Sequence, residues 1–133
     1  MGEVVREILP ACPDIDAGKF EPREQRLVRN RLAEVLRYVV CQRLLPRVGG
    51  GRVAAVEIMG QSLRVRQLIR EGEGADATFH QAITEGGSYG WQSFDRHLVQ
   101  LYERGLIGEE AARAHASEPA ELGHGLDRVR ASR

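Results

Sequence analysis

The sequence predicts a mainly helical α/β chain that contains one β-hairpin and five or six helices. Three observations support this prediction. Apolar residues recur at helical spacing over residues 27–40, three consecutive glycines separate two apolar segments at residues 49–51, and short helical patterns then continue to residue 129. Because a two-stranded hairpin is marginally stable alone, we expect it to complete a larger sheet.

The first strong helix is expected after an irregular N-terminal segment, residues 1–21, in which prolines and glycine interrupt any regular element. Pro22 suits the first turn of a helix, where its missing N–H costs nothing. The apolar residues that follow predict a helix that ends near Cys41 or Arg43. These residues are Leu27, Val28, Leu32, Val35, Leu36, Val39 and Val40.

The spacing of apolar residues then changes from a helical to a strand pattern, and residues 44–48 and 52–59 predict the two strands of the hairpin. The glycines at 49–51 permit a tight reversal between them. The second strand is apolar on both faces, so we expect it to be largely buried.

Helices are expected in the rest of the chain. Ser62 can cap a helix that runs to Arg70, with Leu68 and Ile69 on its buried side and Gly72 beyond its end. After a glycine-rich break at residues 86–90, Ser93 can cap another helix, which Gly105 terminates. Further helices are expected at residues 77–85, at 109–116 and at 119–129, the last opened by Ser117.

Composition excludes several classes of function. The 133 residues carry 19 basic and 19 acidic side chains, so no net field would attract nucleic acid or an anionic membrane. No signal-peptide pattern and no apolar run of about 18 residues are present, so any membrane role is expected to be peripheral. Cys12 and Cys41 match no zinc or redox spacing and are expected to be reduced thiols.

Several segments resemble the PilT-type retraction ATPases of type IV pili, within the type II/IV secretion ATPase superfamily. Residues 29–59 end in GGGRVAAVEIM, which is similar to a strand of that family, and residues 64–71, RVRQLIRE, resemble its AIRNLIRE signature. GWQSFD at residues 90–95 and the pattern at residues 98–116 complete a match over residues 22–118. The matching structural positions are Gly50, Gly51, Arg52, Glu57, Gly90, Gln92 and Asp95.

The resemblance implies that residues 22–133 form the C-terminal portion of a RecA-like ATPase domain. Full-length members of the family form hexameric rings, use Mg-ATP, and act on a platform protein of the pilus at the cytoplasmic face of the inner membrane. The chain would then supply subunit packing and the surface specific to retraction, with no cofactor of its own. The residues expected at that surface are Arg66, Leu68, Ile69, Arg70 and Glu71.

The sequence departs from the family pattern in two motif positions: Arg64 stands where the signature has alanine, and Trp91 replaces the usual methionine. No G-x-x-x-x-G-K-[ST] loop occurs in the 133 residues, and their only lysine, Lys19, lies in no such motif. The chain by itself is therefore not expected to be an enzyme. The alternative interpretation is a stand-alone helical interaction module that docks on a pilus or secretion ATPase.

Individual residues have competing interpretations. Arg64, Arg66 and Arg70 form either a functional surface or a solvated basic face that pairs with Glu71 or Glu73. A carboxylate in an apolar strand needs a partner, so we expect an arginine near Glu57 rather than a catalytic role. Trp91 is expected to be a core or interface anchor. The histidines, His80, His97, His115 and His124, show no metal-ligand spacing.

Overall fold

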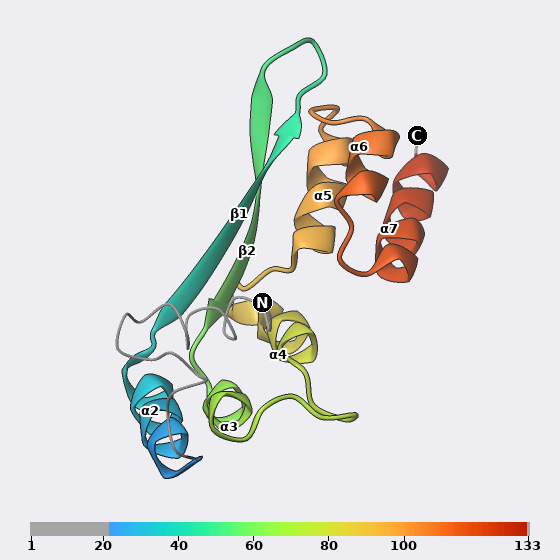
Figure 1. Ribbon diagram of the computed structural model, residues 1–133. Helices are drawn as coiled ribbons and strands as arrows, with labels where there is room; N and C mark the ends of the chain where they lie inside the picture. The colour runs from blue at the N-terminus through green and yellow to red at the C-terminus, as the bar shows by residue number, and fades with distance from the viewer. Residues whose placement is uncertain (1–21, 133) are drawn as a thin grey trace. The chain divides into compact units, whose positions relative to one another are not determined.

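The computed structural model describes residues 22–132, which form six α-helices, one short 3₁₀-helix and a two-stranded sheet (Figure 1). The mainly helical fold with a single hairpin is thus confirmed for this part of the chain. The predictions for residues 1–21, including the one for Cys12, lie outside the described residues. The elements are α2 (Pro22–Val35), β1 (Tyr38–Pro46), β2 (Arg52–Gly60), α3 (Leu63–Glu71), α4 (Phe79–Glu85), η1 (Gly86–Tyr89), α5 (Phe94–Glu103), α6 (Glu109–Ala114) and α7 (Pro119–Ala131).

The first helix is shorter than the sequence predicts. It ends at Val35, and the residues expected to continue it to Cys41 or Arg43 belong to β1 instead. Along this strand Val39 and Leu45 are buried while Val40 is exposed, which is the two-residue alternation of a half-buried strand. Pairing with β2 therefore outweighs the helical spacing of the same apolar residues.

The predicted hairpin is confirmed, and its turn needs glycine. Gly49, Gly50 and Gly51 have φ angles of 85°, 105° and 77°, a region that side-chain-bearing residues rarely adopt. The turn is closed by hydrogen bonds from the N–H of Arg47 to the carbonyl of Gly51 (3.1 Å) and from the N–H of Gly50 to the carbonyl of Arg47 (3.1 Å). Burial in β2 is less complete than predicted, because its residues alternate between buried and half-buried.

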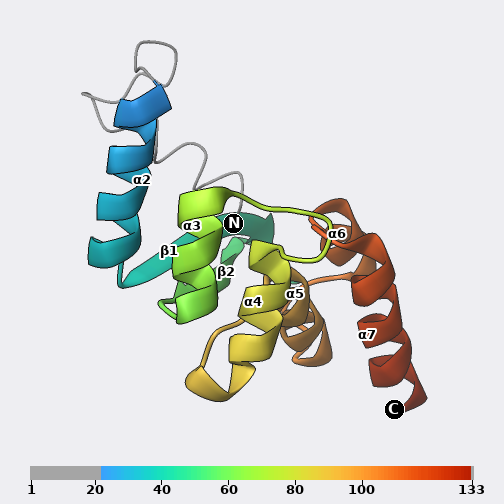
Figure 2. The ribbon, with the colours of Figure 1, turned by 90° about the horizontal axis from the view of Figure 1, so that it is seen from below.

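The chain divides into two compact units, each with its own interior. The described part of unit 1 comprises residues 22–39 and 58–91. Figure 2 shows its helices α2, α3 and α4 as neighbours. Its buried side chains include Leu68 and Ile69, as predicted, together with Phe79 and Ile83 of α4.

Unit 2 comprises residues 40–57 and 92–132 of the described chain. Helices α5, α6 and α7 pack together beside the turn end of the hairpin (Figure 1). The backbone N–H of Val48, just after β1, also donates to the carbonyl of Leu106 at 2.9 Å. The core of this unit consists of Leu45, Ala55, Phe94, Leu98, Leu101, Ile107, Ala112, Leu122 and Leu126.

Most of the predicted helix caps are present. The Ser93 hydroxyl accepts from the N–H of Arg96 at 3.3 Å, and Gly105 has a φ angle of 69° after α5, as expected for a helix terminator. The prediction that Ser117 opens the last helix is wrong. The N-cap residue of α7 is Glu118 and makes no side-chain cap, because a carboxylate from α5 takes that role.

Candidate functional site

The segment that resembles the retraction signature forms helix α3, which is fixed at both ends. The hydroxyl of Ser62 accepts from the N–H of Val65 at 3.1 Å, as the sequence predicts. At the other end, Gly72 has a φ angle of 91° and donates its N–H to the carbonyl of Leu68 at 2.8 Å. The guanidinium of Arg29, on α2, donates to the carbonyl of Ile69 at 3.2 Å. The helix end therefore has few unsatisfied carbonyls.

The five residues expected at the retraction surface divide into two groups. Leu68 and Ile69 are buried in the core of unit 1, whereas Arg66 is half-buried and Arg70 and Glu71 are exposed. The solvent-facing part of the motif is therefore polar and charged.

Each of the three polar side chains has a partner within unit 1. Arg66 donates to the side-chain oxygen of Gln61 at 3.0 Å. Arg70 lies 3.7 Å from the carboxylate of Glu34 on α2, and Glu71 accepts from Gln67 at 3.0 Å. These contacts connect α3 to α2 and to the end of β2.

Arg64, which departs from the family pattern, bridges two helices. Both oxygens of Glu85, at the end of α4, accept from its guanidinium at 2.9 Å. The alternative of pairing with Glu71 or Glu73 is not what the structure shows, since Glu73 accepts instead from the N–H of Phe79 at 2.8 Å. Because both side chains of the Arg64–Glu85 pair are exposed, its contribution to stability is small, about 0–1 kcal/mol.

Two carboxylates of the family motifs are buried in unit 2. Glu57 accepts a hydrogen bond from the N–H of Phe94, at the start of α5, at 3.4 Å. Asp95 accepts from the N–H groups of Ser117 (2.9 Å) and Glu118 (3.0 Å). Both carboxylates thus satisfy backbone N–H groups at helix starts, which is a structural role. An arginine partner for Glu57 stays a prediction.

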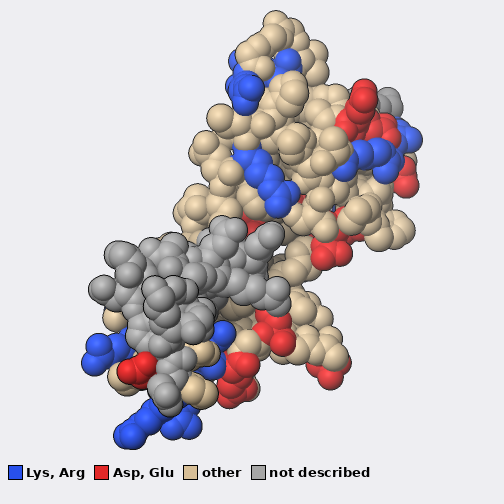
Figure 3. All heavy atoms as spheres, viewed as in Figure 1, with Lys and Arg blue, Asp and Glu red and all other residues tan. Residues whose placement is uncertain are grey.

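The remaining motif positions also shape the backbone or bond to it. Gly90 has a φ angle of 81° and ends η1, and Gln92 donates to the carbonyl of Val56 at 3.3 Å. Gly50 and Gly51 lie in the hairpin turn and Arg52 begins β2. Figure 3 shows basic side chains at this tip of the hairpin, and basic and acidic groups interspersed elsewhere on the described surface of that face.

Trp91 is buried, as predicted for an anchor, against two glycines that sequence reasoning did not connect with it. A Cβ atom built on Gly60 would lie 2.5 Å from Nε1 of the indole, and one built on Gly86 would lie 2.1 Å from Cε3. Both glycines are therefore needed because the ring leaves no space for a side chain. In the sequence, the tryptophan that replaces the usual methionine marks this position as unusual. No local spacing indicates that Gly60 and Gly86 lie against it.

No group of three or more potential metal ligands occurs among the described residues. Burial lowers the pKa of His97, whose Nδ1 accepts from the N–H of Val56 at 2.9 Å. Burial raises the pKa of the Cys41 thiol, so its reactive thiolate form is disfavoured. Residues 22–132 contain no helix that is both long and apolar enough to cross a bilayer.

Comparison with known proteins connects these motifs to pilus motors. No protein-family model matches the chain. It is 44% identical over 100 residues to the type IV pilus retraction ATPase PilT of Pseudomonas aeruginosa, covering 75% of the chain and 28% of that protein. It is 39% identical over 104 residues to a twitching motility protein of Neisseria gonorrhoeae, covering 77% of the chain and 27% of that protein.

Comparison with solved structures agrees with this sequence similarity to pilus motors. The crystal structure of the pilus retraction motor PilT with bound ADP matches with a TM-score of 0.66 and 29% identity, over 93% of this chain and 32% of that one. The ATPase DotB of Legionella pneumophila shares the fold, with a TM-score of 0.60 and 22% identity over 86% of this chain and 28% of that one. The chain thus spans less than a third of these proteins. With sequence and fold in agreement, the chain belongs to the PilT-type ATPases of type IV pilus retraction, part of whose length it represents.

Proposed function

We propose that this chain is the C-terminal, non-catalytic segment of a type IV pilus retraction motor, where it provides subunit packing and a surface specific to retraction. Helix α3 carries that surface. ATP hydrolysis belongs, in this proposal, to a portion of the motor other than these 133 residues. The absence of a G-x-x-x-x-G-K-[ST] loop in the 133 residues supports this division of roles.

The observation that carries the proposal is the way in which α3 is held. Its two ends are capped, its inner face is buried, and Arg70 joins it to Glu34 on α2. A helix fixed in this way presents Arg66, Arg70 and Glu71 in a stable arrangement, which suits a surface that transmits movement.

The partners follow from membership of the family. We propose that the whole protein forms a hexameric ring with copies of itself, binds Mg-ATP, and acts on the platform protein of the pilus at the cytoplasmic face of the inner membrane. The ADP in the crystal structure of the related motor supports nucleotide use by the whole protein.

A second candidate is a stand-alone helical module that docks on a pilus or secretion ATPase. The observation in its favour is that each of the two units has its own buried apolar core. Titration of the purified chain with fluorescent Mg-ATP, with its mass in solution measured in parallel, separates the possibilities. A stable monomer without nucleotide affinity favours the module, whereas micromolar binding would contradict both non-catalytic proposals.

The direct test uses a full-length motor that carries this segment. Reversing the charge at Arg66 and Arg70 should abolish twitching while ATP binding is retained, because the surface is altered and the nucleotide site is not. Arg31→Glu is a matched control, since Arg31 is an exposed arginine of the same unit on α2. Normal twitching by the double variant would refute the assigned surface.

A further inference from the structure

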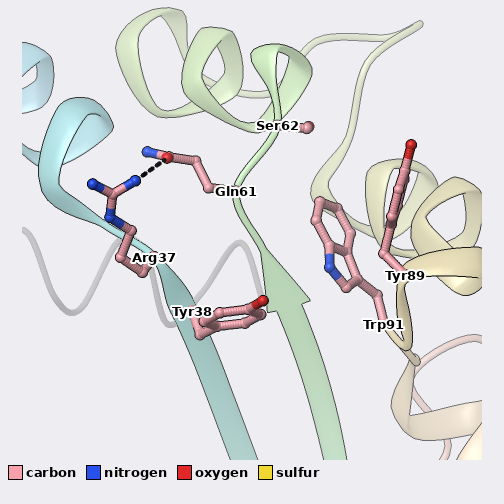
Figure 4. Close-up of a pocket in the computed structure, with 6 residues that line it drawn as sticks. All are labelled: Arg37, Tyr38, Gln61, Ser62, Tyr89 and Trp91. Atoms are coloured by element: carbon pink, nitrogen blue, oxygen red, sulfur yellow. Dashed lines mark hydrogen bonds between the residues drawn. The ribbon is translucent and has the colours of Figure 1, made fainter.

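Unit 1 contains a hollow of about 390 Å³ where β1 begins and β2 ends. Its size lies within the usual range for ligand sites, roughly 300–1,000 Å³. Figure 4 shows aromatic side chains on two sides, Tyr38 from the start of β1 and Tyr89 and Trp91 from the end of η1 and just after it, with the hydrogen-bonded Arg37 and Gln61 nearby. The described residues that line it are Arg37, Tyr38, Gln61, Ser62, Tyr89 and Trp91.

Two positive charges converge at one neutral acceptor beside this hollow. The side-chain oxygen of Gln61 accepts from Arg66 at 3.0 Å and, weakly, from Arg37 at 3.5 Å. The amide is oriented for this role because its nitrogen donates to the carbonyl of Ala33 at 2.8 Å. Neither guanidinium pairs with a carboxylate in the described part of the chain. Two cations that share one amide oxygen repel each other. An anion placed next to both would relieve that repulsion.

Two hydrogen-bond donors of unit 1 have no acceptor among the described residues. The Nε atom of Arg66 is buried and has no hydrogen-bond partner among the described residues. The indole N–H of Trp91 has no acceptor among residues 22–132 either, but this atom is open to solvent rather than buried. A buried donor without a partner costs roughly 1–3 kcal/mol, so an acceptor that reached the Arg66 Nε would be favoured.

The rim of the hollow is apolar and open to solvent. Tyr89 is 78% exposed and Tyr38 is 69% exposed, and Leu63, directly after Ser62, is 83% exposed. The rings of Tyr89 and Trp91 lie with their centroids 6.1 Å apart. Exposed aromatic side chains around a concave polar centre are typical of protein-binding surfaces.

We propose that this hollow binds an acidic side chain, presented by a segment of a partner protein. The carboxylate takes a position beside Arg37 and Arg66, next to the side-chain oxygen of Gln61, where it neutralises both charges. Apolar residues next to that side chain in the partner pack on Tyr38 and Tyr89. The described lining contains one arginine and no acidic residue, which gives the charge complementarity that such a segment requires.

Trp91 reports on this site directly, because it is the only tryptophan in the 133 residues. The probe is the capped tripeptide Ac-Glu-Leu-Glu-amide, titrated into the whole chain, and its counterpart Ac-Gln-Leu-Gln-amide is the control. Tryptophan fluorescence and the NMR signal of the indole N–H are both recorded. We expect a saturable change in both signals with the glutamate peptide, weakened by salt, and at least about tenfold weaker binding of the glutamine peptide.

The variant Arg37→Gln removes one of the charges, and Arg31→Gln is its control on the same unit. We expect at least about tenfold weaker binding of the glutamate peptide to Arg37→Gln, with an unfolding midpoint equal to or above that of the wild type because repulsion is relieved. Binding to Arg31→Gln should be unchanged. An unresponsive Trp91, equal responses to both peptides, or full binding by Arg37→Gln would overturn the proposal. Because Arg37 lies outside the retraction motif, this outcome is independent of the twitching test above.

Discussion

The carboxylate of Asp95 accepts a hydrogen bond from the backbone N–H of Glu118 at 3.0 Å, so a side chain in the first turn of α5 caps the start of α7. Its other oxygen accepts from the N–H of Ser117 at 2.9 Å. The negative charge also lies at the positive end of the α7 dipole. The final residue of the GWQSFD motif therefore holds the C-terminal helix in unit 2.

We expect Asp95→Ala to lower the free energy of unfolding by about 1–3 kcal/mol, since it leaves two backbone N–H groups without their acceptor. Urea denaturation of the whole chain measures the change. Glu103→Ala is the matched control because Glu103 is an exposed acid on the same helix. Equal stability of the two variants would show that the cap contributes nothing.

The contact between Trp91 and Gly86 gives a second prediction. Gly86→Ala should destabilise the chain by about 1–3 kcal/mol, because the added methyl group would overlap the indole ring. Gly74→Ala is the control, since nothing lies within 4 Å of a Cβ at that position. Trp91→Met, which restores the usual family residue, should relieve the overlap in the double variant. A double-mutant cycle of unfolding free energies with no coupling between residues 86 and 91 would contradict this account.

Helix ends were the most predictable features of the fold. Ser62, Ser93 and Gly105 act through contacts within a few residues of the chain, so their roles could be inferred from local sequence. The end of α2 could not be inferred from local sequence. Val39 and Val40 fit both a helical and a strand pattern over a short window, and only pairing with β2, which is distant in sequence, decides between them.

The candidate sites were predictable only in part, for the same reason. Resemblance to a family identifies the motif residues of α3 but does not show which of them face solvent. Arg37 lies 24 positions before Gln61, on which it and Arg66 converge, and no sequence spacing indicates this contact. Asp95 was recognised as part of a motif, but its role depends on a helix that starts 24 residues later, at Pro119.

The half-buried His97 of unit 2 gives a prediction about pH. The Nδ1 atom of His97 must be unprotonated to accept from the N–H of Val56, and burial and the charge of Arg104 lower its pKa below the ordinary value. The unfolded chain therefore binds more protons than the folded chain between the two pKa values. Stability should be fully present above about pH 6.5 and decrease as the pH falls through the lower, folded-state pKa.

Urea denaturation at several pH values tests this expectation. His97→Gln should be less stable at neutral pH but should lose part of the acid-dependent decrease, because the group that titrates is gone. His124→Gln replaces an exposed histidine on α7 and is the control, which should keep the wild-type slope. Identical slopes for all three proteins would exclude His97 as the source.

The last prediction concerns Arg43 of β1, which contacts the segment that Asp95 also holds. Its guanidinium donates to the carbonyl of His115 at 2.8 Å and to the hydroxyl of Ser117 at 3.2 Å, and it lies 4.1 Å from the centre of the Phe94 ring. Lysine keeps the charge but has no planar group that can make all three contacts.

We therefore expect Arg43→Lys to lower the free energy of unfolding by about 1–2 kcal/mol. Arg47→Lys, at an exposed arginine near the hairpin turn, should change it little. If Arg43 and Asp95 act on the same segment, the effects of Arg43→Lys and Asp95→Ala should not add, because either change frees residues 115–118 from one of its two attachments. Strict additivity in urea denaturation would mean that the two side chains hold that segment independently, and unchanged stability of Arg43→Lys would mean that charge alone is sufficient.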